Sequence, residues 1–169
     1  MKQILFLLTT LACFISCKKK EAEKTPERIS SVTVNGTLWA SDHTTPPPSG
    51  SYATLYYYKN TQKLTLSIIN TDTGEKIILL LKAPTNITNT TYNFDGKDYT
   101  ASFYLADESR LMNKVVTGSV LIRQLSFSGE NIDRFDADFN FQQTSEDLEG
   151  NPFNHKIENA SVRNLKGTI

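Results

Sequence analysis

Cysteine is almost absent from this chain. Both of its cysteines, Cys13 and Cys17, lie within the first seventeen residues. The remaining residues therefore exclude internal disulfides, thiol catalysis, cysteine-ligated zinc and iron–sulfur clusters. The domain must be held together by buried apolar surface instead. Roughly 150 residues suffice for this, because a domain of that size buries about 70% of its unfolded surface.

Histidine is also scarce, and neither sign of charge is in excess. His43 and His155 are the only histidines, and 18 basic residues balance 18 acidic ones. The run Ser41-Asp42-His43 contains the residue types of a hydrolase triad, but adjacent residues cannot form the spatial relay that a triad requires. We interpret this run as a polar loop and His155 as a surface residue of a strand. The sequence predicts no enzyme, no cofactor and no nucleic-acid partner.

Three acidic loops could offer oxygen ligands to calcium. None has the spacing of a calcium-binding loop, and Asp, Asn and Gly favour turns for reasons of backbone geometry. We therefore predict turns and no metal site, with calcium as the alternative. The three sets are Asp72 with Glu75, Asp95 with Asp98, and Glu146 and Asp147 with Glu149.

No apolar run is long enough to cross a bilayer as a helix. Residues 3–16 form an uncharged, largely apolar stretch of 14 residues between Lys2 and Cys17, whereas a spanning helix needs about 20. A short apolar run behind a positive charge is typical of a secretory signal peptide. We predict that residues 1–16 are such a peptide.

The end of this stretch, Phe-Ile-Ser-Cys at residues 14–17, resembles the lipobox of bacterial lipoproteins. The resemblance implies that Cys17 becomes the lipidated N-terminus; Cys13 and cleavage without lipid are the alternatives. Two or three acyl chains would anchor the protein stably, since a single chain binds only reversibly. The expected location is the bacterial cell envelope, with the outer membrane favoured and the periplasmic or surface side left open.

Residues 17–28 are predicted to be a lipidated cysteine followed by a flexible, charged tether. They include three consecutive lysines and Pro26, and they have no apolar periodicity. A coil of this length has its ends roughly 20 Å apart. The tether would let the following domain stand away from the bilayer.

Residues 29–169 are predicted to form a single all-β domain. Apolar residues recur with period two between turn signals, about nine strands follow at intervals of about 8–12 residues, and no long helix is expected. This pattern favours an antiparallel β-sandwich, with a closed or partly open up-and-down barrel as the alternative. Residues 107–113 form the one plausible helical turn.

Three segments carry specific structural expectations. Asn35-Gly36 predicts a two-residue hairpin. The run Ile77–Leu81 is apolar at every position, as in a central strand covered on both faces. Residues 135–141 alternate Phe or Ala with Asp or Asn, which predicts a strand with one buried and one wet face.

Some of these residues resemble a family of small envelope lipoproteins that is classed only as a domain of unknown function. The resemblance implies an all-β, lipid-anchored domain and transfers no catalytic residue. The residues that carry it are Val34, Asn35, Gly36 and Trp39, then Gly118, Val120 and Ile122, and finally Phe139 and Phe141.

Aromatic residues provide the main signal for binding. Tyr56 and Tyr58 share one face of a strand, while Tyr57 lies on the other face with Leu55. Exposed rings can stack on sugars, so the candidate ligand-binding residues are Trp39, Tyr56 and Tyr58. The leading hypothesis is a non-catalytic binding or structural module anchored to the membrane by lipid, with an envelope protein or a glycan as partner. The alternative is a glycan- or small-ligand-binding accessory lipoprotein.

Overall fold

The computed structural model describes residues 29–83, 85–106, 112–146 and 149–167, and these contain ten strands and no helix. The expected all-β fold is therefore confirmed, with ten strands instead of about nine. The predicted signal peptide, Cys17 and the tether lie outside the described residues, as do residues 107–111 of the expected helical turn. The strands are β1 (Ser30–Val34), β2 (Thr37–Ser41), β3 (Ser51–Tyr58), β4 (Lys63–Asn70), β5 (Lys76–Lys82), β6 (Ile87–Asn93), β7 (Tyr99–Tyr104), β8 (Met112–Ser128), β9 (Asn131–Glu146) and β10 (Pro152–Gly167).

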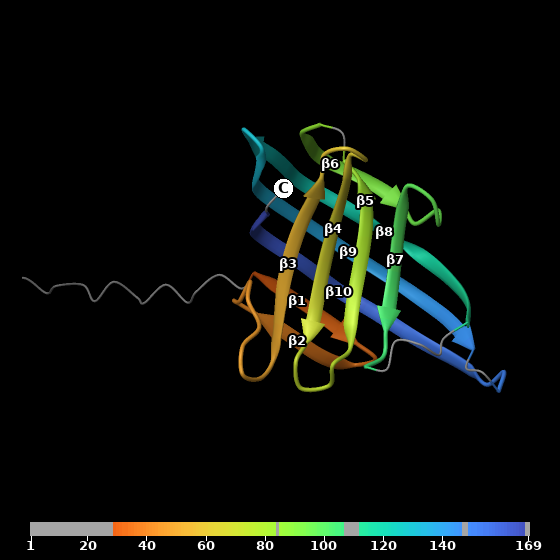
Figure 1. Ribbon diagram of the computed structural model, residues 1–169. Coiled ribbons are helices and arrows are strands. Elements are labelled where there is room, and N and C mark those ends of the chain that lie inside the picture. Colours follow the sequence, from red (N-terminus) through yellow and green to blue (C-terminus); the bar gives the residue numbers. More distant parts are fainter. Residues whose placement is uncertain (1–28, 84, 107–111, 147–148, 168–169) are drawn as a thin grey trace, which may run out of the picture.

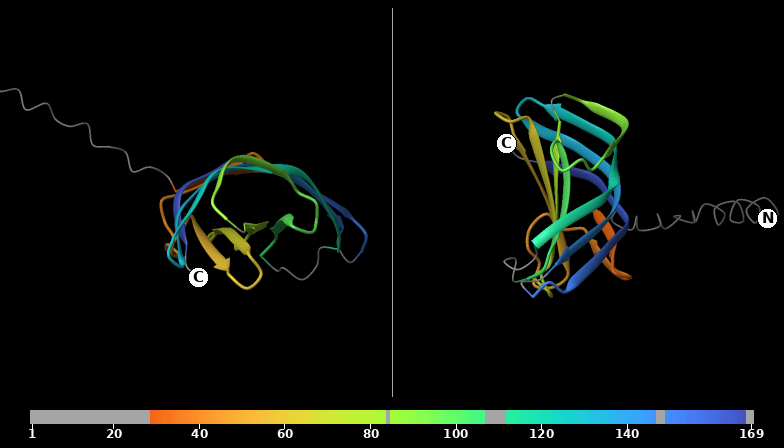
Figure 2. Two further views of the ribbon diagram at one scale, coloured as in Figure 1. Left: turned by 90° about the horizontal axis from the view of Figure 1, so that it is seen from above. Right: turned by 90° about the vertical axis from the view of Figure 1, so that its right-hand side faces the viewer.

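The strands form two antiparallel sheets packed face to face. One has six strands in the order β2-β1-β10-β9-β8-β6, and the other has four in the order β3-β4-β5-β7. The four-stranded sheet lies in front of the larger one and crosses it obliquely (Figure 1). Seen from above, the larger sheet curves around the smaller (Figure 2). Each sheet ends in two edge strands, so the sandwich is confirmed and the closed barrel is wrong.

The hairpin predicted at Asn35-Gly36 connects β1 and β2. Both residues have positive φ, 49° and 85°, as a type I′ turn requires, and the register pairs Val34 with Thr37. Asn35 also fastens the turn to β10, because its backbone N–H donates to the Lys156 carbonyl (2.9 Å) and its Oδ1 accepts from the Lys156 N–H (2.8 Å).

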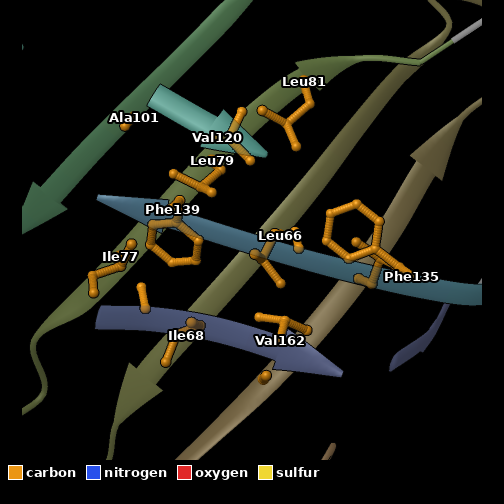
Figure 3. Packing of buried hydrophobic residues seen from close by; sticks show 14 of the residues in the cluster. Leu66, Ile68, Ile77, Leu79, Leu81, Ala101, Val120, Phe135, Phe139 and Val162 are labelled. Carbon is orange, nitrogen blue, oxygen red and sulfur yellow. The ribbon is translucent and has the colours of Figure 1, made fainter. Parts of the chain in front are cut away.

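The core lies between the sheets. Inward side chains of β4 and β5, such as Leu66 and Leu79, meet Phe135 and Phe139 of β9 and Val162 of β10 (Figure 3). Phe135 and Phe139 lie on the inward face that the alternation predicted. The outer face of β9 is less wet than expected, because Asp136 is only 5% exposed and forms a 2.6 Å ion pair with Arg134.

The expectation that β5 is covered on both faces is wrong. Ile77, Leu79 and Leu81 are fully buried against the larger sheet, but Leu80 is 38% exposed and Ile78 is partly buried. The strand is central within its sheet, yet no described element covers the outer side of that sheet (Figure 1). The outward side chains of β5 therefore place apolar groups on an open surface of the molecule.

Candidate functional site

The outward side chains of β3, β4, β5 and β7 form one continuous surface, which we call the outer sheet face. The strand register aligns them in rows across the sheet. Aromatic, hydroxyl, aliphatic and lysine side chains alternate along these rows. The rows are Tyr52, Ile69, Lys76 and Tyr104; then Thr54, Ser67, Ile78 and Ser102; then Tyr56, Thr65, Leu80 and Thr100; and finally Tyr58, Lys63 and Lys82.

Tyr56 and Tyr58 are the most exposed aromatic residues of this face, at 49% and 56%. Tyr57 is partly buried on the opposite side and packs on Phe127, with ring centroids 4.9 Å apart. The structure thus separates the three neighbouring tyrosines as strand alternation predicts. Trp39 does not join the exposed pair: it is 4% exposed in β2 of the other sheet and lies 6.3 Å from the Phe103 ring.

The outer sheet face contains lysine but no acidic residue, because β3, β4, β5 and β7 include no Asp or Glu. Lys82 lies 3.3 Å from Asp98 in the loop before β7. Among the described residues Lys63 has no ion-pair partner. Lys63 therefore gives this face a positive charge that no carboxylate of the described residues pairs with.

Lysines also surround the ring of Tyr104 at the β7 edge. The Nζ atoms of Lys114 and Lys76 lie 4.1 Å and 5.3 Å from the ring centroid, within the range of cation–π attraction. No local pattern predicts this group, because the three residues come from β5, β7 and β8 and only the fold brings them together.

A pocket of about 540 Å³ adjoins this group at the edge of the sheet. Its wall combines hydroxyl, ammonium, carboxylate and apolar groups, and such a mixture of polar and apolar groups is found in small-ligand sites. Nearby, Tyr99 stacks on Tyr92 with ring centroids 4.1 Å apart, and burial together with this neighbour raises the pKa of Tyr99 to about 12. The pocket is lined by Phe94, Asp95, Gly96, Thr100, Ala101, Ser102, Lys114, Val115 and Val116.

His155 is a buried residue, which corrects its assignment to the strand surface. It is 6% exposed and lies 4.4 Å from the ring of Phe103. Its Nδ1 is 3.3 Å from Nδ2 of Asn35, while its Nε2 has no hydrogen-bond partner among the described residues. Burial lowers the pKa of His155, and the Glu75 carboxylate opposes this shift. Period-two alternation with Ile157 could have indicated the inward position.

The burial of His155 predicts a pH-dependent stability. Because its pKa in the folded protein lies below the ordinary 6.5, the unfolded chain binds the proton first as pH falls. Stability should decrease below about pH 6.5, by at most about 1.4 kcal/mol per pH unit from this residue, and level off below the folded pKa. Urea unfolding of wild type and His155→Gln at pH 7.5, 6.5 and 5.5 measures this.

His43→Gln is the matched control, because it removes the other histidine, which is exposed, and the effect of His155 on the pH slope should persist in it. If His155→Gln loses as much stability on acidification as the wild type, His155 is not the group responsible.

The run Ser41-Asp42-His43 forms a local turn. The Ser41 hydroxyl accepts a hydrogen bond from the His43 N–H (2.8 Å), and the His43 Nε2 lies 3.0 Å from Asp42 Oδ1. The Ser41 oxygen is thus engaged by the backbone of His43, whereas the imidazole contacts Asp42. This arrangement holds the loop before β3.

The acidic loops are organised by backbone hydrogen bonds. Asp95 Oδ1 accepts from the N–H groups of Lys97, Asp98 and Tyr99 at 2.8–3.0 Å, and these donors, Tyr99 first, lower the pKa of Asp95. Asp72 accepts from the Gly50 N–H at 3.0 Å. Across the residues that the structure describes, no three His, Cys, Asp or Glu side chains are grouped to hold a metal ion. Asp147 lies outside these residues.

Comparison with known proteins adds no further assignment. No family model matches the chain, and neither a curated protein nor a solved structure matches it. The residues that the structure describes include no helix with the length and apolar character needed to span a membrane. The resemblance to envelope lipoproteins stays a prediction.

Proposed function

We propose that this protein is a non-catalytic, lipid-anchored component of the bacterial cell envelope that acts as a binding or structural module. The observation that carries the binding role is the outer sheet face, an open surface with exposed tyrosines and lysines and no carboxylate in its strands. Aromatic residues are enriched at recognition sites, and a surface of one charge sign attracts ligands of the opposite sign.

The anchoring role is supported by the sequence around Cys17. An apolar segment precedes this cysteine, a polar tether follows it, and the chain has no cysteine after it. A thiol at position 17 can therefore be lipidated without competition from the folded domain. A lipid anchor would hold the binding face within reach of envelope components.

A second candidate is a glycan- or small-ligand-binding accessory lipoprotein. The observation that favours it is the exposure of Tyr56 and Tyr58 on one face, two residues apart along β3. Flat exposed rings supply apolar contact to a ligand whose other groups stay hydrated. The pocket beside β7 adds a concave element at the far end of the same face.

Substitution of Cys17 by serine should release the protein from the membrane fraction. In the wild type, we expect nearly all of the protein in the membrane fraction and an N-terminal peptide whose mass shows acylated Cys17, because two or three acyl chains anchor a protein effectively irreversibly. In Cys17→Ser, we expect that peptide mass to disappear and the protein to become soluble or to remain as the uncleaved precursor. Fractionation and peptide mass spectrometry measure both.

Cys13→Ser is the matched control, since it removes the other cysteine of the leader and should leave both readouts unchanged. Unmodified Cys17 in the membrane-bound wild type, or release by Cys13→Ser alone, would contradict the proposal.

A further inference from the structure

We propose that the outer sheet face binds an acidic polysaccharide, whose carboxylate or sulfate groups pair with the lysines while its sugar rings lie on the tyrosines. This inference rests on the proposed function, because it names the ligand class of a binding surface that the anchor would hold in the envelope. Three properties of the face support it: its charge, its hydroxyl groups and its shape.

The charge of the face differs from that of the opposite sheet. On the six-stranded sheet, Asp138 is paired with both Arg123 and Arg163, and Lys156 lies 2.7 Å from Glu158. Three cations of that sheet, Arg123, Lys156 and Arg163, are thus neutralised in place.

The four-stranded sheet has lysines with no acidic residue among its strands. Lys82 lies 3.3 Å from Asp98 in the loop before β7, but Lys63 has no ion-pair partner among the described residues, so the face attracts an anionic ligand.

The hydroxyl groups favour a polar ligand with many hydrogen-bonding groups. Thr65 and Ser67 occupy the middle of the face in β4, and Thr100 and Ser102 occupy its β7 edge. A hydrophobic partner would remove water from these hydroxyls and would offer no hydrogen bonds in its place. Burial of unpaired hydroxyls in this way is costly. A glycan can replace them, because each sugar presents several hydroxyls.

The shape of the face suits an extended polymer ligand. Four strands at about 4.8 Å spacing make a surface about 14 Å wide, and Tyr56 and Tyr58 lie about 7 Å apart along one edge strand. The row that starts at Tyr56 ends at Thr100, which lines the 540 Å³ pocket. A polymer can therefore lie across the sheet and place one residue or branch in the pocket.

Binding is tested with the mature, full-length protein purified in mild detergent. The probes are polygalacturonate, dextran sulfate and uncharged dextran, compared by calorimetry and affinity electrophoresis at low and high salt. We expect at least one acidic polymer to bind, with an affinity that falls as salt rises, and uncharged dextran to bind at least about tenfold more weakly. The two acidic polymers distinguish carboxylate from sulfate recognition.

Variants of the face locate the site. Tyr56→Ser/Tyr58→Ser and Lys63→Gln/Lys82→Gln should each weaken binding about tenfold or more, since contacts of this kind concentrate binding energy. The matched controls are Leu38→Ser, at an exposed apolar side chain of β2 (57% exposed), and Lys156→Gln, at an exposed lysine of β10. Both controls should bind like the wild type.

Lysine acetylation of the wild-type protein provides a readout that needs no variant. The acidic polymer should protect Lys63 and Lys82 but not Lys156. This measurement shows whether the polymer binds at the outer sheet face even if a face variant fails to fold.

Three results would overturn the proposal: no binding of either acidic polymer at low salt, protection of Lys156 instead of Lys63 and Lys82, or equal loss of affinity in the control variants. Equally tight, face-dependent binding to glycan-free vesicles of phosphatidylglycerol and phosphatidylethanolamine would also overturn it, in favour of a membrane-facing surface. The Cys17→Ser fractionation is independent of all these results. A failure of the proposed polysaccharide binding can therefore be distinguished from a failure of the proposed lipid anchor.

Discussion

Substitution of Gly118 by alanine should destabilise the protein by about 3 kcal/mol or more. Gly118 lies in β8 with φ +146°, a backbone conformation that L side chains rarely adopt. A Cβ at this position would lie 2.2 Å from the Asn140 carbonyl oxygen and 2.6 Å from the Phe141 Cα. These are backbone atoms of β9, which is held between β8 and β10, so they cannot move aside cheaply.

Urea unfolding at neutral pH measures this loss as a lower midpoint with an unchanged slope. Gly129→Ala is the matched control, because Gly129 also has positive φ (+62°) but has no atom within 4 Å of the added Cβ. It should cost only the conformational strain, about 1–2 kcal/mol. Equal effects of the two substitutions would show that the close approach of β8 to β9 is not what requires glycine at position 118.

Substitution of Gln143 by leucine should destabilise the protein by about 2–5 kcal/mol. Gln143 belongs to β9 and is fully buried. Its Oε1 accepts a hydrogen bond from the Phe103 N–H (2.8 Å), and its Nε2 donates to the Phe103 carbonyl (3.1 Å). Phe103 lies in the edge strand β7, so this side chain supplies the hydrogen bonds that a further strand would make. Leucine would leave both buried backbone groups unsatisfied.

The free energy of unfolding in urea again measures the loss, and hydrogen exchange locates it, since the Phe103 amide should lose its protection. Gln142→Leu is the control: Gln142 is the exposed neighbour on the opposite face of β9, and its replacement should change stability by no more than about 0.5 kcal/mol. If Gln143→Leu is as stable as the wild type, the link between the two sheets at this point contributes little.

Several features of the fold could be predicted because their causes are local. Asn35-Gly36 specifies a hairpin through the positive φ that both residues accept, and alternation of Phe with Asp or Asn specifies which side of β9 is buried. The same reasoning separated Tyr56 and Tyr58 from Tyr57. Each of these inferences needs only neighbouring residues and the two-residue repeat of a strand.

The sequence-based expectations that differ from the structure do so for a common physical reason. Ile77–Leu81 is apolar on both faces, but whether a second layer covers its outer side depends on where other strands pack. Trp39 and His155 are amphipathic residues that suit a surface as well as a core, and both are buried beside Phe103. Their positions depend on contacts between the two sheets, which the local pattern does not encode.

By itself, the sequence determined that this domain is all-β, that it has no thiol after Cys17, and that its tyrosines divide between two faces of a strand. These properties follow from composition and from short-range backbone geometry. Only the tertiary structure decided that the four-stranded sheet has an open face without acidic residues, that Lys76 and Lys114 meet at Tyr104, and that Gln143 caps the β7 edge. Those features join residues that are distant in the chain, and packing of the two sheets is what brings them into contact.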